Sequence, residues 1–407
     1  MKKVVVIGGG TVGWLTALFA QKFWANIDVT LIASSKIDIL GAGEGTTPNF
    51  PTILSRLNIN EEDFMEKTGC TKKYGIDFVN WRGDGKSFKH NFQNNELVYA
   101  YHFDARLVAK YLEEFSKDKN IKRIDAIIKG FNENENGINE IILDNGEIVK
   151  CDFVFDCSGF QELVIGKHFK TEWVSYADQL LCNSAIAFFL PQDNPDIQKT
   201  KTWTKGISMK NGWVWGAPLK HRWGSGYVFS DKHTTTEEVL SEAEEYFGRK
   251  LDIVKEFKFK SGTYKKFWVK NCVAVGLASS FLEPMEATSM MTSIMFLKGL
   301  LDYNFDEKYR DLYNERMFNY NEQNMLFVRH HYTCDRLDTK FWVDYKNTPL
   351  PDKLAKLYNE QGAFNFPTHN LKVKEMLAHD LNFSNFNWGS WQTIHKGKSG
   401  IYTKNLV

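Results

Sequence analysis

The chain of 407 residues lacks a large net charge, a long apolar run and a paired cysteine motif. Its formal charge of +1 at pH 7 gives no basic surface of the kind that binds nucleic acid. No run of about 18 apolar residues is present, which argues against a membrane span. The six cysteines have no C-x-x-C spacing, so we expect no zinc or thioredoxin-type site and mostly buried, reduced thiols.

The start of the chain also lacks a signal-peptide cleavage pattern. Lys2 and Lys3 precede an apolar run, as they would in a secretory signal, but three glycines interrupt the run and no small-residue cleavage site follows. We therefore expect a cytoplasmic protein.

A glycine-rich turn after the first apolar run is the strongest local motif. Residues 4–8 are typical of a buried strand, and they lead into Gly8-x-Gly10-x-x-Gly13 and an amphipathic stretch. In this context the glycines let the backbone approach a pyrophosphate, and the helix N-terminus offers free N–H groups. Residues 28–32 complete a dinucleotide-binding half-fold.

The rest of the chain alternates strand-like and helical segments. A helix is expected over 104–117, a hairpin at the Asp144-Asn145-Gly146 turn, and a largely helical tail after residue 300. This predicts an α/β protein whose cofactor domain is discontinuous. The expected parts are a first cofactor-binding part (1–184), a β-rich substrate-side segment (185–265), a return to the cofactor domain (266–300) and a helical, substrate-covering region (301–407).

Four motifs in order resemble those of the flavin-dependent tryptophan halogenases and their relatives. They are Gly8-x-Gly10-x-x-Gly13-Trp14, Lys73-x-Gly75-Ile76-x-Phe78-x-Asn80-Trp81, Trp213-x-Trp215-x-x-Pro218 and Glu283-Pro284-x-Glu286-Ala287-Thr288. The likeness extends to residues 156–160, 224–227 and Trp391. It implies a FAD-binding, Rossmann-like domain of the glutathione-reductase and hydroxylase type. In that family reduced FAD and oxygen convert halide to hypohalous acid, which crosses a tunnel to an aromatic substrate.

The resemblance also implies which residues bind the cofactor. Position 33 departs from the usual pattern, because Ala33-Ser34-Ser35 stands where an acidic residue normally holds the ribose, and a serine hydroxyl or a backbone group would replace it. The loop at 41–48 is either close to the flavin ring or an ordinary surface turn. The cofactor-binding set is Gly8, Gly10, Thr11, Val12, Gly13, Ala33, Ser34, Gly43, Glu44, Gly276 and Leu277.

Lys73 is the candidate that meets the hypohalous acid. Its ammonium would hydrogen-bond and polarise the oxidant, or its free amine would form a haloamine. Strand alternation does not select it, since Lys72 would share a face with Ile76 and Phe78, whereas Lys73 would share one with Gly75. The motif selects Lys73, and the alternative is a solvated lysine at a strand edge.

Glu286 is the candidate partner carboxylate. It would stabilise the cationic ring intermediate or accept its proton, and in a dry pocket it and Lys73 would help keep each other charged. The alternative is an acidic residue in the first turn of a helix.

The halide is expected at the backbone of Thr288 and Ser289, because small residues at a helix start can bind an anion. Well-known tryptophan-acting members have serine where this chain has Ala287. The loss of a hydroxyl there would favour bromide or iodide over chloride.

The substrate side is expected to include Trp213, Trp215, Pro218 and His331. The two tryptophans share one face of a strand, and in the family this pair is thought to hinder oxygen transfer from flavin to substrate; core packing is the alternative. His330 and His331 have no acidic neighbour at ligand spacing on their helix, so we interpret them as structural or pocket-lining rather than metal ligands.

No second G-x-G-x-x-G follows a strand, so a nicotinamide domain is not expected. The implied system has two components, in which a separate NAD(P)H-dependent flavin reductase supplies FADH2.

The substrate would be an electron-rich indole, phenol or pyrrole. The chain is shorter than typical tryptophan-acting members in its C-terminal half, which predicts an open, less selective pocket. The alternatives are an aromatic hydroxylase of the same fold and a non-catalytic flavin-binding protein. The sequence is also compatible with a homo-oligomer.

Overall fold

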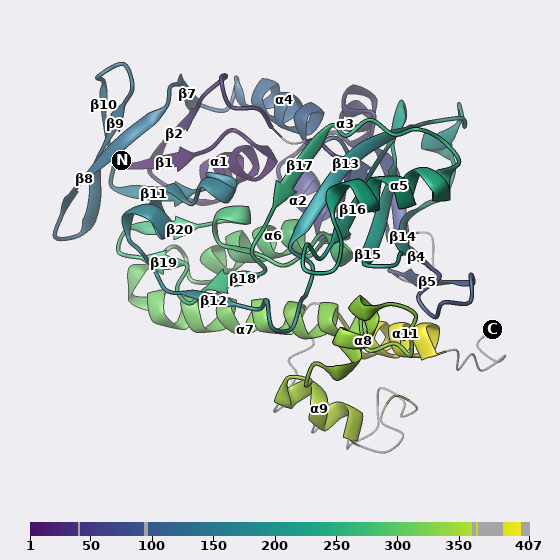
Figure 1. Cartoon of the computed structure of the whole chain (residues 1–407). Helices are drawn as coiled ribbons and strands as arrows, with labels where there is room; N and C mark the ends of the chain where they lie inside the picture. Colours follow the sequence, from purple (N-terminus) through teal and green to yellow (C-terminus); the bar gives the residue numbers. More distant parts are fainter. Residues whose placement is uncertain (40, 93–96, 360–363, 365–385, 400–407) are drawn as a thin grey trace.

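The computed structural model describes residues 1–39, 41–92, 97–359, 364 and 386–399. Two large sheets lie side by side, with helices packed around and between them (Figure 1). All six cysteines are free, and all except Cys157 are buried. In the described part of the chain, no helix is long and apolar enough to cross a membrane.

The first sheet is the predicted dinucleotide-binding sheet, with strand order β19-β20-β11-β1-β2-β7. All of its pairings are parallel except β19 with β20. The central strand β1 is apolar because helices cover one of its faces and a smaller β-layer covers the other. The strands are β1 (Lys2–Ile7), β2 (Ile27–Ala33), β7 (Ile121–Asp125), β11 (Phe153–Asp156), β19 (Trp268–Val269) and β20 (Cys272–Ala274).

Two three-stranded sheets flank the first sheet. One contains the predicted Asp144-Asn145-Gly146 hairpin, which joins two antiparallel strands. Their strands are β8 (Ile128–Asn134), β9 (Gly137–Leu143) and β10 (Ile148–Lys150) in one, and β12 (Trp173–Ser175), β18 (Gly262–Tyr264) and β21 (Ser280–Phe281) in the other.

The second large sheet has nine strands in the order β17-β13-β16-β15-β14-β4-β6-β3, with β5 paired to β4. It combines strands from residues 44–103 with strands from residues 184–258, so the β-rich layer also uses chain that precedes position 104. The strands are β3 (Glu44–Gly45), β4 (Thr71–Val79), β5 (Ser87–Asn91), β6 (Ala100–Phe103), β13 (Ser184–Pro191), β14 (Thr202–Ser208), β15 (Gly212–Pro218), β16 (Arg222–Phe229) and β17 (Lys255–Lys258).

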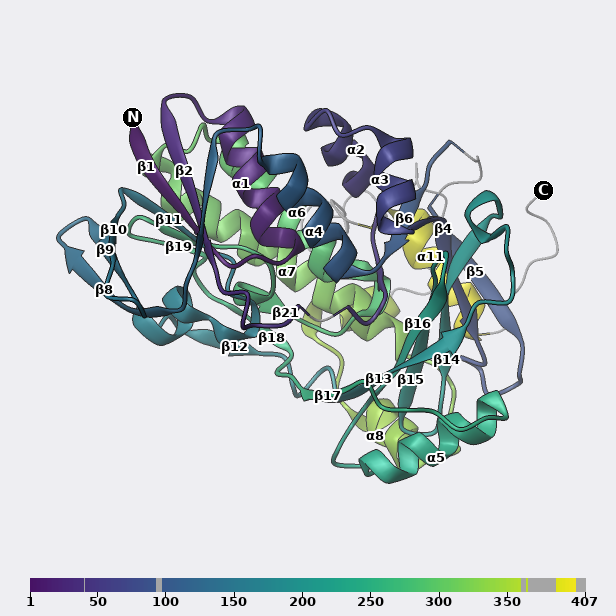
Figure 2. The same cartoon turned by 90° about the horizontal axis from the view of Figure 1, so that it is seen from above.

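Helices cover the first sheet and form most of the C-terminal part. Seen from above, α1, α4 and α6 lie beside the first sheet, and α2 and α3 lie between α4 and the second sheet (Figure 2). The α/β class and the helical C-terminal part are confirmed. The α-helices are α1 (Thr11–Phe23), α2 (Asn49–Arg56), α3 (Glu61–Thr68), α4 (Ala105–Ser116), α5 (Thr236–Phe247), α6 (Thr288–Asp302), α7 (Arg310–His331), α8 (Lys340–Asn347), α9 (Asp352–Asn359) and α11 (Trp388–Ser399).

Short helical turns lie between these elements, and one of them, η5, carries Glu286. They are η1 (Gly159–Gln161), η2 (Leu163–His168), η3 (Ile197–Lys199), η4 (Gly276–Ala278), η5 (Met285–Ala287) and η6 (Glu307–Tyr309).

Candidate active site

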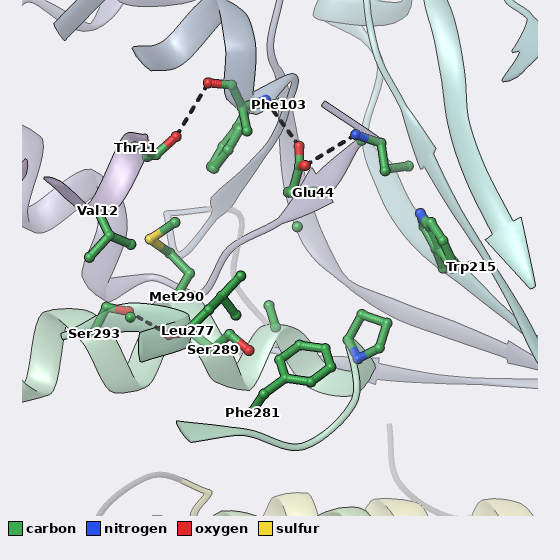
Figure 3. Close-up of a pocket in the computed structure, with 18 of the residues that line it drawn as sticks. Thr11, Val12, Glu44, Phe103, Trp215, Leu277, Phe281, Ser289, Met290 and Ser293 are labelled. Carbon is green, nitrogen blue, oxygen red and sulfur yellow. Dashed lines mark hydrogen bonds between the residues drawn. The ribbon is translucent and has the colours of Figure 1, made fainter. Parts of the chain in front are cut away.

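A cavity of about 330 Å³ lies where the two large sheets meet. Thr11 and Val12 face it from α1, Glu44 and Trp215 from the second sheet, and Ser289 from α6 (Figure 3). Lys73 and Glu286 also line this cavity. One space therefore contains the predicted cofactor turn and both predicted catalytic side chains.

The first turn of α1 is shaped to hold a phosphate group. Gly10 occupies the N-cap without a side chain, no acidic residue lies in the first turn, and a Cβ at Gly10 would meet nothing within 4 Å. At Gly13, in contrast, a Cβ would lie 1.9 Å from the Gly8 carbonyl oxygen. The turn is thus closed on its inner side and open toward the cavity. An uncapped helix N-terminus of this kind fits the pyrophosphate of a dinucleotide.

The loop that contains Gly43 and Glu44 reaches the same cavity. The Glu44 carboxyl accepts hydrogen bonds from the backbone N–H of Ala42 and of Ala105, at 3.2 and 3.0 Å, so it ties the loop to the start of α4. Desolvation by burial raises the pKa of Glu44 to about 8, and the charge of Asp104 adds to this effect. A protonated Glu44 places no full negative charge beside a bound dinucleotide.

Ala33 and Ser34 lie at the end of β2 and are not among the residues that line the cavity. Ala33 packs against Gly9, and the Ser34 hydroxyl accepts a hydrogen bond from the backbone N–H of Lys36. The backbone N–H of Ser35 donates to Asp125, at the end of the neighbouring strand β7. An acidic side chain is therefore present at this sheet edge, although on a different strand from the one expected.

A bulge in β4 explains how Lys73 reaches the cavity. Thr202 of β14 pairs with Lys73, but Thr204 pairs with Ile76, so β4 carries one extra residue between them. Gly75 permits this, since a Cβ there would lie 2.2 Å from the His90 carbonyl oxygen. The extra residue reverses the alternation, so that Lys73 lines the cavity together with Ile76. Lys72 points the other way and forms an ion pair with Glu61.

The Lys73 ammonium group is held in an apolar setting. The residue is 1% exposed, and its Nζ lies 5.5 Å from the centre of the Phe92 ring. A Cβ at Gly45 would lie 2.9 Å from the Lys73 Nζ, so this glycine leaves room for the ammonium group. Desolvation lowers the pKa of Lys73 to about 8, against the opposing attraction of Glu286. Both the ammonium and the free amine are therefore accessible near neutral pH.

Glu286 occupies a left-handed backbone conformation, with φ of 58°. Its Oε1 lies 2.8 Å from Nδ1 of His90 and 3.1 Å from Nε2 of His331. Burial opposes ionisation, but the charge and hydrogen bonds of the two imidazoles outweigh it and hold the pKa of Glu286 well below its usual range. A strained backbone and two buried partners keep this carboxylate at the cavity wall.

Helix α6 begins directly after Glu286. Its N-cap, Ala287, is also left-handed, with φ of 55°, and no side chain caps the helix. Ala287 and Ser289 line the cavity, whereas the Thr288 side chain turns back toward the Met285 carbonyl oxygen. Of the two predicted halide residues, the structure brings Ser289 to the cavity and leaves Thr288 behind it.

The remaining predicted residues divide into two groups. Trp213, Trp215, Gly276 and Leu277 line the cavity. Pro218 is buried at the end of β15, where its carbonyl oxygen accepts a hydrogen bond from the Thr71 hydroxyl, and His331 contacts Glu286 from α7. Neither of these two is among the cavity-lining residues.

The sequence interpretation missed three residues near the catalytic pair. His90 contacts Glu286, Phe92 lies over the Lys73 ammonium, and Thr204 lines the cavity with its hydroxyl 2.8 Å from Nε2 of the buried His102. The alternation of Ser-Phe-Lys-His-Asn at 87–91 was a usable signal for His90, because Phe88 and His90 share the buried face of β5.

The family assignment rests on the whole chain. A family model described as tryptophan halogenase matches residues 3–97 and 93–404. The chain belongs to this family, which consists of flavin-dependent halogenases. FAD is thus the dinucleotide that the family implies for the glycine turn.

Individual relatives agree with this assignment. The chain is 28% identical to tryptophan 6-halogenase ThaL from Streptomyces albogriseolus, over 87% of this chain and 80% of that protein. It is 28% identical to tryptophan 7-halogenase RebH from Lentzea aerocolonigenes, over 90% and 83%. The structure matches BrvH, a flavin-dependent halogenase from Brevundimonas sp. BAL3, with a TM-score of 0.84 and 29% identity, over 100% of this chain and 91% of that one.

Proposed function

We propose that this protein halogenates an electron-rich aromatic compound, with Lys73 and Glu286 as its catalytic residues. When bound, reduced FAD supplies, together with oxygen, the oxidation of halide to hypohalous acid. Lys73 receives that oxidant at its Nζ, either by hydrogen bonding or as a haloamine. The aromatic carbon then bonds to the halogen as the oxygen–halogen bond of the acid breaks and water leaves with a proton from Lys73, or as the nitrogen–halogen bond of the haloamine breaks and returns the Lys73 amine. Glu286 takes the proton that leaves the same carbon.

The convergence of Lys73 and Glu286 carries this proposal. They come from positions 213 residues apart, on β4 and η5, yet both line the cavity that contains the glycine turn. The desolvated ammonium and the anchored carboxylate feel each other's charge. Two buried groups of opposite charge, both with perturbed pKa values, are typical of a catalytic site.

The substrate is proposed to be an indole, phenol or pyrrole, because only an electron-rich ring attacks a weakly activated halogen. The Phe92 ring beside Lys73 offers an apolar face for such a ring. Bromide or iodide is proposed as the preferred halide over chloride, since Ala287 offers no hydroxyl to a strongly hydrated anion. Reduced FAD is proposed to come from a separate NAD(P)H-dependent flavin reductase.

The experiment supplies chemically reduced FAD, oxygen and an equimolar mixture of chloride, bromide and iodide, with a panel of indoles, phenols and pyrroles. Mass spectrometry should detect a halogenated product that is absent without enzyme or without halide. NADH without a reductase should give no flavin reduction in a stopped-flow measurement. A hydroxylated product in place of a halogenated one, or no product with any ring, would refute the proposal.

A further inference from the structure

Glu286 is the centre of a buried chain of three contacts. Its Oε1 lies 2.8 Å from Nδ1 of His90 and 3.1 Å from Nε2 of His331. The other ring nitrogen of His331, Nδ1, lies 2.8 Å from the carbonyl oxygen of Phe327, one turn earlier in α7. His331 and Glu286 are 1% and 3% exposed, so bulk water does not replace any of these contacts.

Each of the three contacts needs one proton between its two heavy atoms. The Phe327 carbonyl oxygen only accepts, so Nδ1 of His331 carries a hydrogen. A neutral His331 then has a bare Nε2 facing Glu286, and two lone pairs would meet at 3.1 Å. The Nδ1–H of His90 supplies the proton of its own contact with Glu286. Two neutral imidazoles and a carboxylate thus supply two protons for three contacts.

We propose that the third proton is on His331, so that this residue is an imidazolium at neutral pH and forms a buried ion pair with Glu286. This part of the proposal requires only the contacts and no assumption about the reaction. The helix supports the geometry, because the Phe327 carbonyl oxygen directs Nδ1 and thereby aims Nε2 at Glu286.

The surroundings of His331 bear on this state in opposite directions. Burial lowers the pKa of His331 below its ordinary value, and the hydrogen bond and charge of Glu286 offset this only in part. The imidazolium is favoured by the proton count of the three contacts, which a neutral ring does not satisfy. The rings of Phe78, Trp81 and Phe327 pack around it, with centres 5.2, 6.2 and 4.9 Å away. Among the described residues, the titratable groups that interact with it include Glu286, His90 and the neighbouring His330.

The imidazolium makes His331 a positioning residue for the proposed reaction. It fixes Oε1 of Glu286, and no hydrogen bond from the described residues reaches Oε2, which is left for the cavity that Glu286 lines. Its charge also offsets that of the carboxylate, so Lys73 feels less attraction from Glu286 and releases its own proton more readily. This second effect rests on the proposed role of Lys73.

The neighbouring His330 provides an internal control. It is also fully buried, but its Nε2 faces the Trp391 carbonyl oxygen and its Nδ1 faces the Tyr358 hydroxyl, at 3.1 and 2.9 Å. The hydroxyl can donate, so a neutral ring satisfies both contacts. Burial lowers the pKa of His330 well below its usual value. We therefore expect opposite protonation states at two consecutive histidines.

Nitrogen-15 NMR of the full chain, labelled at histidine, tests the proposal directly. We expect an imidazolium signal from His331 at neutral pH and a neutral signal from His330. The Glu286→Gln variant assigns the imidazolium signal to His331. Its amide can donate a hydrogen bond to Nε2 of a neutral ring, so the imidazolium signal should disappear. The His331→Gln variant identifies the signal of His331, because that signal is lost from its spectrum. If the signal so identified is that of a neutral ring in the native protein, the proposal is overturned. Because the experiment needs no turnover, it stands apart from the proposed function.

A second measurement tests the effect on Lys73. His331→Gln keeps an N–H donor toward Oε1 but carries no charge, so the pH inflection of turnover assigned to Lys73 should rise by about one pH unit. His331→Asn is the second variant if the first does not fold. An unchanged inflection in a folded variant would remove the link between His331 and Lys73, whereas the NMR result would still decide the protonation state.

Discussion

The two ends of the cavity are built in different ways. At the cofactor end, the groups available to a ligand are the uncapped backbone of α1 and the empty space at Gly10. At the catalytic end they are side chains, Lys73 and Glu286, which a bulge and a left-handed backbone bring to the cavity. The first end depends on residues close together in sequence, and the second depends on strands and turns that meet only after folding.

This difference predicts how mutations act at each end. At the cofactor end, an added side chain should block binding without affecting catalytic chemistry. At the catalytic end, removing a side chain should stop the reaction and leave FAD binding intact. Removing the charge of Lys73 should also stabilise the fold, because a buried charge in an apolar wall costs free energy. Five predictions, arranged from the largest expected effect to the smallest, test this separation.

Lys73→Ala should reduce halogenation by at least about a thousandfold, because Lys205, the other lysine among the described residues that line the cavity, is already paired with Asp77. Titration with FAD should give an unchanged dissociation constant. Lys72→Ala is the matched control, since Lys72 faces the opposite side of β4 and pairs with Glu61. Product formation by Lys73→Ala at the native rate would remove Lys73 from the mechanism.

Glu286→Gln should lower kcat by about 10² to 10⁴, the usual range for loss of a general base. Glu283→Gln is its matched control. Glu283 belongs to the same motif and is equally buried, and burial raises its pKa to about 7, but it does not line the cavity. Single-turnover rates should separate the two variants. Equal losses would mean that the motif is structural and that neither carboxylate acts on the substrate.

Lys73→Met should stabilise the protein by about 3 kcal/mol near neutral pH. Burial lowers the pKa of Lys73 from its ordinary 10.5 to about 8, so the unfolded chain binds the proton more tightly. The resulting penalty is fully present below pH 8 and is relieved as the pH rises toward 10.5. Urea unfolding near pH 7 and near pH 10 should show a large difference from the native protein at the lower pH and a small one at the higher. A difference independent of pH would point to packing alone.

The same contrast explains what could be predicted from the sequence. The β1-turn-α1-β2 unit and the hairpin at 144–146 follow from neighbouring residues, and both are confirmed. Strand alternation misplaced Lys73, because the extra residue beside Gly75 becomes visible only when β4 pairs with β14, more than 120 residues later. The contact of Glu286 with His90 spans 196 residues. This contact forms only in the tertiary structure, whereas the periodicity of apolar residues along the sequence indicates only secondary structure.

Gly10→Ala should weaken FAD binding about tenfold, or 1.4 kcal/mol, without changing the stability of the fold. The Gly10 backbone has φ of −74°, which alanine adopts, and the added methyl group would enter only open cavity. Gly13→Ala should instead destabilise the protein by several kcal/mol, since its Cβ would collide with the Gly8 carbonyl. Calorimetric titration and thermal unfolding distinguish the two. Native FAD affinity in Gly10→Ala would place the pyrophosphate elsewhere.

The smallest effect is expected at Ala287, the cavity-lining residue at the N-cap of α6. Ala287→Ser restores a hydroxyl beside the N-terminus of α6 and should shift the ratio of chlorinated to brominated product about threefold toward chloride, or about 0.65 kcal/mol. Ala287→Gly separates this effect from backbone strain, because glycine adopts φ of 55° freely and should stabilise the fold by about 1 kcal/mol with no change in the product ratio. One-pot competition between the halides measures both variants. A product ratio that shifts equally in Ala287→Gly would assign halide preference to the backbone of this turn rather than to the missing hydroxyl.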